Sequence, residues 1–393
     1  MQQNVPISRK GIFKTVSSAL GRPQILQRFF FTQKKPTVVS DKQSDLEHTK
    51  IRIMVVGVGG AGGNAVLRMA RSPSSNLNYL AVNTDIQALK QMDGVSVCAI
   101  GPNSTRGLGS GGNPNIGRKA IRESQLEIAE LLTGADVVFV TAGMGGGTGT
   151  GAAATIAGLA RKQGALTVGI VTTPFSFEGP RRQEVAQKGL DHLNAKVDTL
   201  ITVQNDKLLP FLGSDVSLET AFVLADELLR QGVQGISEIV GTTGMINLDF
   251  ADVKSVISNG GPSFMAVGEG KGKSAAVDAI DDALTNPLFD TAIRGARGIL
   301  LNVKGGMDLG LDQIHEITEV IKKATSREAN LLFGVVQDPK WKKRVSVTLI
   351  ATGLTSENRY VSCGSVEPTS VSASKPKING FRPPTSIPSH HLT

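Results

Sequence analysis

Short apolar runs recur along the first half of the chain, and each ends in a glycine-rich or polar loop. These runs lie at 51–56, 77–82, 136–140, 166–173 and 198–203. Runs of this length that are apolar nearly throughout are typical of strands covered on both faces, as in a parallel sheet. Helical stretches separate them, so the pattern predicts a doubly wound α/β domain of Rossmann type.

A longer helical pattern begins where these runs end. Apolar residues recur every three or four positions from 217 to 240, which predicts one long helix. Further helices and apolar runs follow at 274–284, 298–303, 311–325, 331–336 and 344–352. No glycine-rich loops separate the later runs, so no nucleotide site is expected among them. The predicted fold class is α/β, with a Rossmann-like domain joined by a long central helix to a smaller α+β domain.

The two ends of the chain differ in composition from the part between them. Residues 1–40 contain seven basic residues and no acidic ones, which is typical of an organelle transit peptide. We expect import into the mitochondrial matrix, with the plastid stroma as the alternative. Residues 356–393 are rich in Ser, Pro, Lys and Thr, and we expect a disordered tail. Between them we place a nucleotide-binding domain at 50–216, a central helix at 217–245 and the second domain at 246–355.

Charge and composition argue against several functions. The net charge is +8, but residues 1–40 account for seven of these charges, so 8 − 7 leaves +1 for the rest. With one tryptophan and two tyrosines there is no evident stacking platform, and nucleic acid is not expected as a partner. Cys98 and Cys363 have neither zinc-site nor disulfide spacing, and no apolar run is long enough to span a membrane.

A glycine-rich stretch at 141–151 reads T-A-G-M-G-G-G-T-G-T-G, between a predicted strand and a predicted helix. At such a turn the backbone N–H groups lack partners and the helix dipole favours negative charge, so a phosphate chain is the expected ligand. Glycine lets the backbone approach the phosphates closely. No lysine occurs between Lys119 and Lys162, so this is not the Gly-Lys-Ser/Thr loop of P-loop nucleotidases.

A second glycine loop, G-V-G-G-A-G-G-N at 57–64, follows the first predicted strand. It matches G-x-G-x-x-G, and Asp85 follows about 20 residues later, as in a dinucleotide site. A Rossmann oxidoreductase that binds NAD(P) or FAD is therefore an alternative from these residues alone. Such an enzyme has no need of the loop at 141–151, which argues against this alternative. A third glycine loop lies at 107–115 and is followed by a helical stretch that is expected to continue to Leu132. The loop at 57–64 leads into a helix that is expected to begin at Ala65.

In their order along the chain these loops resemble those of the tubulin/FtsZ family, whose cell-division branch carries G-G-G-T-G-T-G. The resemblance extends over residues 50–355 and implies a GTPase that binds GTP or GDP with Mg²⁺. It implies that Glu178 binds the ribose, that Phe222 stacks on guanine, and that Asp226 accepts hydrogen bonds from guanine N1–H and the N2 amino group. A carboxylate suits guanine because both groups are donors. The nucleotide ligands implied are Gly60, Ala61, Gly62, Gly63, Asn64, Gly145, Gly146, Gly147, Thr148, Gly149, Glu178, Arg182, Asn205, Phe222 and Asp226.

The segment N-L-D-F-A-D-V at 247–253 places Asp249 and Asp252 at the start of a predicted helix. Carboxylates are favoured there, so capping of the helix is one explanation of the pair. The resemblance implies a second role, since the matching family loop enters the nucleotide site of the next subunit and positions the attacking water. Asp249 and Asp252 are therefore the predicted catalytic residues, and no protein ligand is predicted for a metal.

The resemblance also implies the partners of the chain. We expect head-to-tail filaments of the chain with itself and a ring that divides an organelle, with a paralogue as a further candidate partner. The peptide with which bacterial relatives hold membrane tethers is not recognisable at the C-terminus, so no tether protein is assigned. Besides the oxidoreductase, a filament protein that binds GTP without hydrolysing it stands as an alternative.

Overall fold

The computed structural model describes residues 51–71, 77–211, 217–241, 245–246, 248–285, 293, 295–326 and 328–354. The predicted transit peptide at 1–40, the predicted tail at 356–393 and Asn247 of the predicted catalytic loop lie outside these residues. Within the described ranges no helix is both long enough and apolar enough to cross a bilayer.

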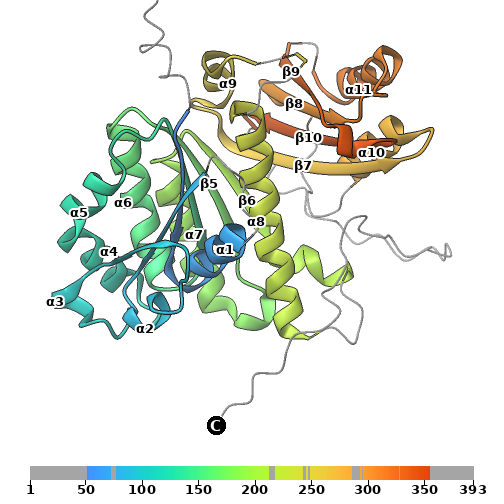
Figure 1. The fold of residues 1–393 in the computed structure, drawn as a ribbon. Helices are drawn as coiled ribbons and strands as arrows, with labels where there is room; N and C mark the ends of the chain where they lie inside the picture. The colour runs from blue at the N-terminus through green and yellow to red at the C-terminus, as the bar shows by residue number, and fades with distance from the viewer. Residues whose placement is uncertain are drawn as a thin grey trace, which may run out of the picture. The chain divides into compact units, whose positions relative to one another are not determined.

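Ten strands of the described chain form one sheet, in the order β3-β2-β1-β4-β5-β6-β7-β10-β8-β9 (Figure 1). The pairings from β3 to β6 are parallel, and the order 3-2-1-4-5-6 is that of a Rossmann fold. The predicted doubly wound α/β fold is therefore confirmed. The strands are β1 Ile53–Val58, β2 Leu77–Asn83, β3 Ser96–Ala99, β4 Val137–Gly143, β5 Leu166–Thr173, β6 Thr199–Gln204, β7 Gly261–Lys271, β8 Gly298–Gly305, β9 Asn330–Gln337 and β10 Arg344–Thr352.

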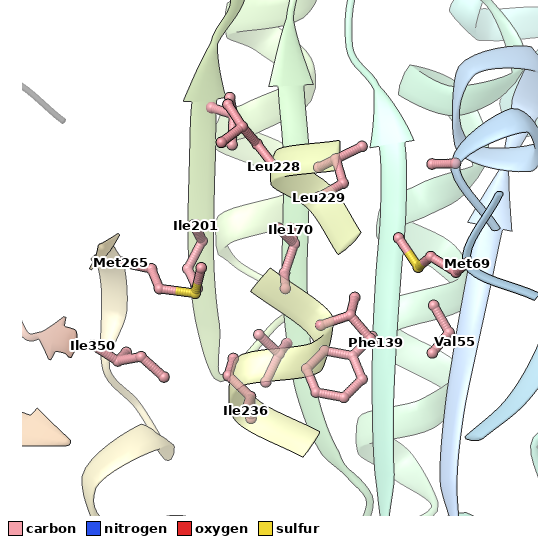
Figure 2. Close-up of a cluster of buried hydrophobic side chains, with 14 of the residues drawn as sticks. Val55, Met69, Phe139, Ile170, Ile201, Leu228, Leu229, Ile236, Met265 and Ile350 are labelled. Atoms are coloured by element: carbon pink, nitrogen blue, oxygen red, sulfur yellow. The ribbon is translucent and has the colours of Figure 1, made fainter. Parts of the chain in front are cut away.

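Helices cover both faces of the parallel strands. Val55 and Phe139 belong to a core shared with α1 and α8, and Figure 2 shows both side chains in this cluster. The alternate residues Val56 and Val138 pack with α4, α6 and α7 on the other face, which explains strands that are apolar throughout. The helices are α1 Gly59–Arg71, α2 Ile86–Leu89, α3 Pro102–Thr105, α4 Pro114–Glu123, α5 Gln125–Leu131, α6 Thr148–Lys162, α7 Pro180–Asn194, α8 Leu218–Gly241, α9 Phe250–Ile257, α10 Ala275–Thr285 and α11 Leu311–Ala324, with 3₁₀ turns η3 Ser176–Glu178, η4 Asn205–Phe211 and η5 Pro339–Trp341.

Helix α8 is the predicted long central helix. Leu228, Leu229 and Ile236 of its buried side face Ile170 and the neighbouring strands in Figure 2. Met265 of β7 and Ile350 of β10 belong to the same cluster. The core of the N-terminal half thus extends into the C-terminal half.

Strand β7 joins the two halves of the sheet, and the sequence did not predict it. Residues 261–263 pair in parallel with β6, and residues 264–271 pair antiparallel with β10. Gly268 and Gly270 interrupt the apolar pattern of the strand, as glycine in a strand commonly does. A Cβ at these two positions would lie 2.1 and 1.9 Å from backbone oxygens of α10, so both glycines let α10 pack directly on β7.

Two helices have bounds different from those expected. α1 begins at Gly59 rather than at Ala65, because the glycines of the loop are themselves helical. The helix expected to continue to Leu132 is broken at Ser124. The hydroxyl of Ser124 accepts a hydrogen bond from the Gly101 N–H at 3.2 Å, which ties the break to the loop before α3.

Candidate functional site

The loops after β1 and β4 meet at the carboxyl edge of the sheet. These strands are neighbours, and their successors β2 and β5 lie on opposite sides of them, so the chain leaves in two directions. Such a switch point forms the crevice in which ligands bind. The two loops touch there, because a Cβ on Gly59 would lie 2.9 Å from the Gly149 nitrogen.

Two glycines of these loops border open space. A Cβ on Gly60 or Gly146 would meet nothing within 4 Å, and neither residue has a positive φ. The fold therefore does not require glycine at either position, whereas a ligand lying against the backbone would. α6 begins beside them at Thr148, and Gly147 before it provides no side-chain cap, so no side chain of the described residues caps the first N–H groups of the helix. These features form a cradle suited to phosphate groups.

The other glycines of the cradle have a packing role. A Cβ on Gly147 would lie 2.2 Å from the Ser110 Oγ, and one on Gly149 would lie 2.8 Å from the Gly143 oxygen. Gly145 has a φ of 96°, which favours glycine. At these positions glycine is explained by the fold itself, and only the backbone N–H groups remain as predicted phosphate ligands.

Buried hydroxyl groups connect the third glycine loop to the cradle. The Thr148 hydroxyl lies 2.7 Å from that of Thr84 at the end of β2 and 2.9 Å from that of Ser110. The Gly109 N–H donates to the Thr84 carbonyl at 3.1 Å. Sequence reasoning did not single out Ser110, since a serine within a glycine loop has no distinguishing pattern.

Asp226 lies in the first half of α8 and is only 9% exposed. The Arg68 Nη1 of α1 donates to its Oδ2 at 2.5 Å. Burial raises the pKa of Asp226 to about 6, and the Arg68 guanidinium opposes that rise. The sequence did not indicate Arg68, because only the packing of α1 against α8 brings the two residues together.

Phe222 lies one turn before Asp226 on α8 and is 39% exposed. Its ring forms a T-shaped contact with Phe175, with ring centroids 5.5 Å apart, and Phe175 in turn stacks on Phe177 at 4.9 Å. These aromatic rings lie in the loop after β5 and at the start of α8. A partly exposed ring beside a buried carboxylate is an arrangement that suits a planar base with donor groups.

The predicted nucleotide ligands Glu178 and Asn205 differ in whether their side-chain oxygens already have partners within the protein. Glu178 accepts from the Phe175 N–H at 2.9 Å and is paired with Arg182, so both of its oxygens have partners within the protein. Asn205 is 4% exposed, and its Oδ1 has no hydrogen-bond partner within the described residues. A buried acceptor without a partner is costly, so Asn205 fits a ligand that donates to it.

Asp249 and Asp252 do not join this site. α9, which they begin, lies at the amino edge of the parallel strands, since the Thr199 hydroxyl at the start of β6 donates to the Ile257 carbonyl at 2.6 Å. In Figure 1 α9 lies where β1 enters the sheet, whereas α2 and α3 lie at the other edge. From Asp226 to the end of α8 alone is roughly 20 Å at the rise of a helix. One chain therefore cannot bring these carboxylates to its own cradle.

The carboxylates of Asp249 and Asp252 are exposed, and they form neither a capping hydrogen bond nor an ion pair within the described residues. Asp249 occupies the N-cap position of α9, but its side chain accepts no capping hydrogen bond, so the capping explanation is wrong for this side chain. Within the described part of the chain neither Asp249 nor Asp252 forms an ion pair. Two free carboxylates three residues apart remain available to a partner.

Comparison with known proteins agrees with this geometry. Residues 52–213 match the model of the tubulin/FtsZ family GTPase domain, and residues 261–355 match the C-terminal domain of the FtsZ family. The structure is similar to that of an FtsZ dimer from M. jannaschii, with a TM-score of 0.74. The two sequences are 40% identical over 79% of this chain and 90% of that one. The chain belongs to the tubulin/FtsZ family.

More distant members of the same fold are also similar. CetZ1 and CetZ2 from Haloferax volcanii are 21% and 22% identical to this chain, each with a TM-score of 0.66. The matches cover 78% of this chain and 95% and 94% of theirs, and at this identity they show the fold alone.

Membership of the tubulin/FtsZ family removes the alternative of a Rossmann oxidoreductase. The structure also gives Asp85 a role that needs no dinucleotide. Its carboxylate caps α2, accepting from the Gln87 N–H at 2.9 Å and the Ala88 N–H at 3.3 Å. The family GTPase domain implies that the cradle binds GTP or GDP.

A magnesium ion fits this cradle only as part of the nucleotide complex. Within the described ranges no group of three or more His, Cys, Asp or Glu residues could hold a metal. Mg²⁺ usually keeps several waters and combines few protein ligands with substrate phosphates. The hydroxyls of Thr84, Ser110 and Thr148 beside the cradle are the groups that would reach it.

Proposed function

We propose that the chain binds and hydrolyses GTP and assembles head-to-tail into filaments that serve the division of an organelle. The observation that carries the proposal is the separation of two half-sites in one sheet. The phosphate cradle lies at the carboxyl edge, and Asp249 and Asp252 lie at the amino edge. Stacking one subunit on the next would join the halves into one complete site.

In this site the described residues select the base and hold the phosphates. Phe222 would stack on guanine while the ionised Asp226 accepts from N1–H and the N2 amino group. Gly60, Gly146 and the first N–H groups of α6 would hold the phosphate oxygens. Mg²⁺, when bound with the nucleotide, offsets the charge on the phosphates.

Asp249 and Asp252 of the adjacent subunit would complete the reaction. Their carboxylates would orient a water against the terminal phosphate and accept its proton. Hydrolysis then depends on contact between subunits, because a single chain has the carboxylates at the wrong edge of its sheet. An interface of this kind joins different surfaces and generates open filaments.

Exposed apolar side chains support assembly through these edges. Leu108 beside the cradle is 82% exposed and Phe177 is 58% exposed. Met245, which precedes α9, is 71% exposed. The structures of relatives agree, since one is described as an FtsZ dimer and another as a GTPγS-bound CetZ2 protofilament.

Sedimentation of the purified full chain tests assembly. We expect pelleting with GTP and little with GDP or without nucleotide, because the terminal phosphate forms part of the contact between subunits. Pelleting to the same extent under all three conditions would contradict a nucleotide-dependent interface.

The proposal of a mitochondrial location rests on the basic, acid-free composition of residues 1–40. We expect these residues, fused to a fluorescent protein, to direct it into mitochondria of eukaryotic cells. A fusion in which all seven basic residues are replaced by glutamine is the control and should stay in the cytosol. Delivery to plastids in plant cells would instead support the alternative.

Nucleotide affinity should depend on the protonation of Asp226. Because the pKa of this carboxyl is about 6, it is ionised at neutral pH and becomes protonated as the pH falls through that value. Protonation removes one acceptor for guanine, so affinity for GDP should be nearly constant at neutral pH and above, and then weaken by up to about tenfold per pH unit below it.

A titration with fluorescent GDP from about pH 8 to about pH 5 measures this dependence. Asp226→Asn is the matched control, since its amide does not titrate in this range. It should bind about 10- to 100-fold more weakly and show a flatter pH profile. Equal pH profiles for the two proteins would contradict the assigned role of Asp226.

A further inference from the structure

A cavity of about 320 Å³ lies on the outer face of the nucleotide-binding half, between α4, α6 and α7. Its floor is the small-residue side of α6, with Gly151, Ala154 and Gly158. A Cβ on Gly151 would lie 2.3 Å from the Pro114 oxygen, so α4 packs directly on this side of α6. The volume is of the size that small-molecule sites have.

Four basic side chains line this cavity, and no acidic one does. They are Arg118 of α4, Lys162 at the end of α6, His192 in the last turn of α7, and Lys196, two residues after α7. Within the described residues none of the four forms an ion pair. The positive charge around the cavity is therefore not neutralised by a direct partner in the described chain.

Three acidic residues of the surrounding helices, Glu123, Glu127 and Asp191, are engaged with other groups, and neither Glu130 nor Glu184 lines the cavity. Glu123 accepts from the N–H groups of Asn103 and Ser104 at 3.1 and 3.2 Å. Glu127 interacts with the buried Cys98 thiol. On α7, the Asp191 carboxylate accepts from the side chain of Gln187 at 3.1 Å.

Helix dipoles explain only part of this arrangement. Cations are favoured at helix C-termini, and Lys162 lies at the end of α6 while Lys196 lies two residues beyond the end of α7. Arg118 lies in the middle of α4, where no dipole favours it. Dipole stabilisation also does not require that cations from three helices converge on one cavity.

We propose that this cavity, the basic groove, binds a small ligand with two linked phosphate groups, such as pyrophosphate, either free or as part of an anionic lipid headgroup. Several cations around one cavity match a ligand with several negative charges. Guanidinium and ammonium groups are the side chains that bind phosphate most strongly. The side chains of Gln125 and Thr155, which also line the groove, add neutral hydrogen-bonding groups.

The test is titration calorimetry of the full chain with pyrophosphate, carried out on protein saturated with GDP. Saturation fills the phosphate cradle, so any remaining binding belongs to another site. The groove variant combines Lys162→Ala with Lys196→Ala. Its matched control combines Lys119→Ala with Lys188→Ala, which removes two exposed lysines of α4 and α7 that do not line the groove.

We expect pyrophosphate to bind the GDP-saturated chain, and the groove variant to bind it at least about tenfold more weakly than the control variant. Circular dichroism should show that both variants remain folded. No binding after saturation with GDP, or equal weakening in both double variants, would overturn the proposal.

A vesicle experiment separates the two sources of the ligand. Vesicles of phosphatidylcholine with and without cardiolipin, a lipid with two phosphates, are sedimented with each protein. The basic residues of 1–40 are the same in all three proteins, so only a difference between the groove and control variants reports on the groove. Such a difference with cardiolipin identifies a lipid headgroup, and pyrophosphate binding without it identifies a free ligand.

Discussion

Asp249→Asn is expected to lower GTP turnover by about 100- to 10,000-fold without weakening GTP binding. The carboxylate is exposed, caps nothing and forms no ion pair within the described residues, so its loss should not disturb the fold. It also lies at the opposite edge of the sheet from the cradle, so it makes no contact with the chain's own nucleotide. Phosphate release and fluorescent GTP affinity measure the two properties separately.

A matched control and a mixing experiment sharpen this prediction. Asp278→Asn removes another exposed first-turn carboxylate, in α10, and should leave turnover unchanged. Mixing Asp249→Asn, which keeps an intact cradle, with Gly146→Val, which keeps an intact catalytic loop, should restore part of the activity. Loss of GTP binding in Asp249→Asn, or no recovery on mixing, would argue against catalysis between subunits.

Gly146→Val is expected to weaken GTP binding by at least about 100-fold while the melting temperature of the nucleotide-free chain stays nearly unchanged. A Cβ at Gly146 would meet nothing within 4 Å, and the residue has no positive φ, so the fold has room for a side chain. That room is where the phosphates are proposed to lie. The added methyl groups would occupy it and block access to the first N–H groups of α6.

Gly147→Ala is the contrasting variant at the next residue. Its Cβ would lie 2.2 Å from the Ser110 Oγ and 2.8 Å from the Asn113 nitrogen, so this substitution should destabilise the fold by about 1–3 kcal/mol. Thermal unfolding without nucleotide and calorimetry with GDP separate the two effects. If Gly146→Val unfolds as readily as Gly147→Ala, or if it binds GDP normally, the phosphates do not lie against Gly146.

The order and type of most elements followed from the sequence, and the reason lies in the sheet. Strands such as β4 are buried on both faces, so they are apolar throughout and easily recognised. The glycine loops follow these strands directly in the sequence, and in a parallel sheet this puts them at the carboxyl edge, where the cradle lies. The interruption between α4 and α5 at Ser124 was not predicted, because it is tied to a hydrogen bond from a distant loop.

The position of Asp249 and Asp252, the predicted catalytic residues, could not be derived from the sequence pattern, because β7 was missed. Its glycines serve the packing of α10 and interrupt the strand pattern. The parallel pairing of β7 with β6 and the hydrogen bond from Thr199 to Ile257 place the segment before β7, including α9, at the amino edge. Arg68 was missed for a related reason, since its pairing with Asp226 spans 158 residues.

The most direct test of catalysis between subunits is the GTPase activity per molecule of the full chain, measured with Mg²⁺ as protein concentration rises. Sedimentation of the same samples reports assembly. The account predicts that activity per molecule is low in dilute solution and rises together with the pelleted fraction, since each site needs carboxylates from a neighbour. Activity per molecule that stays constant across the range in which assembly begins would contradict it, because a single chain would then hold a complete site.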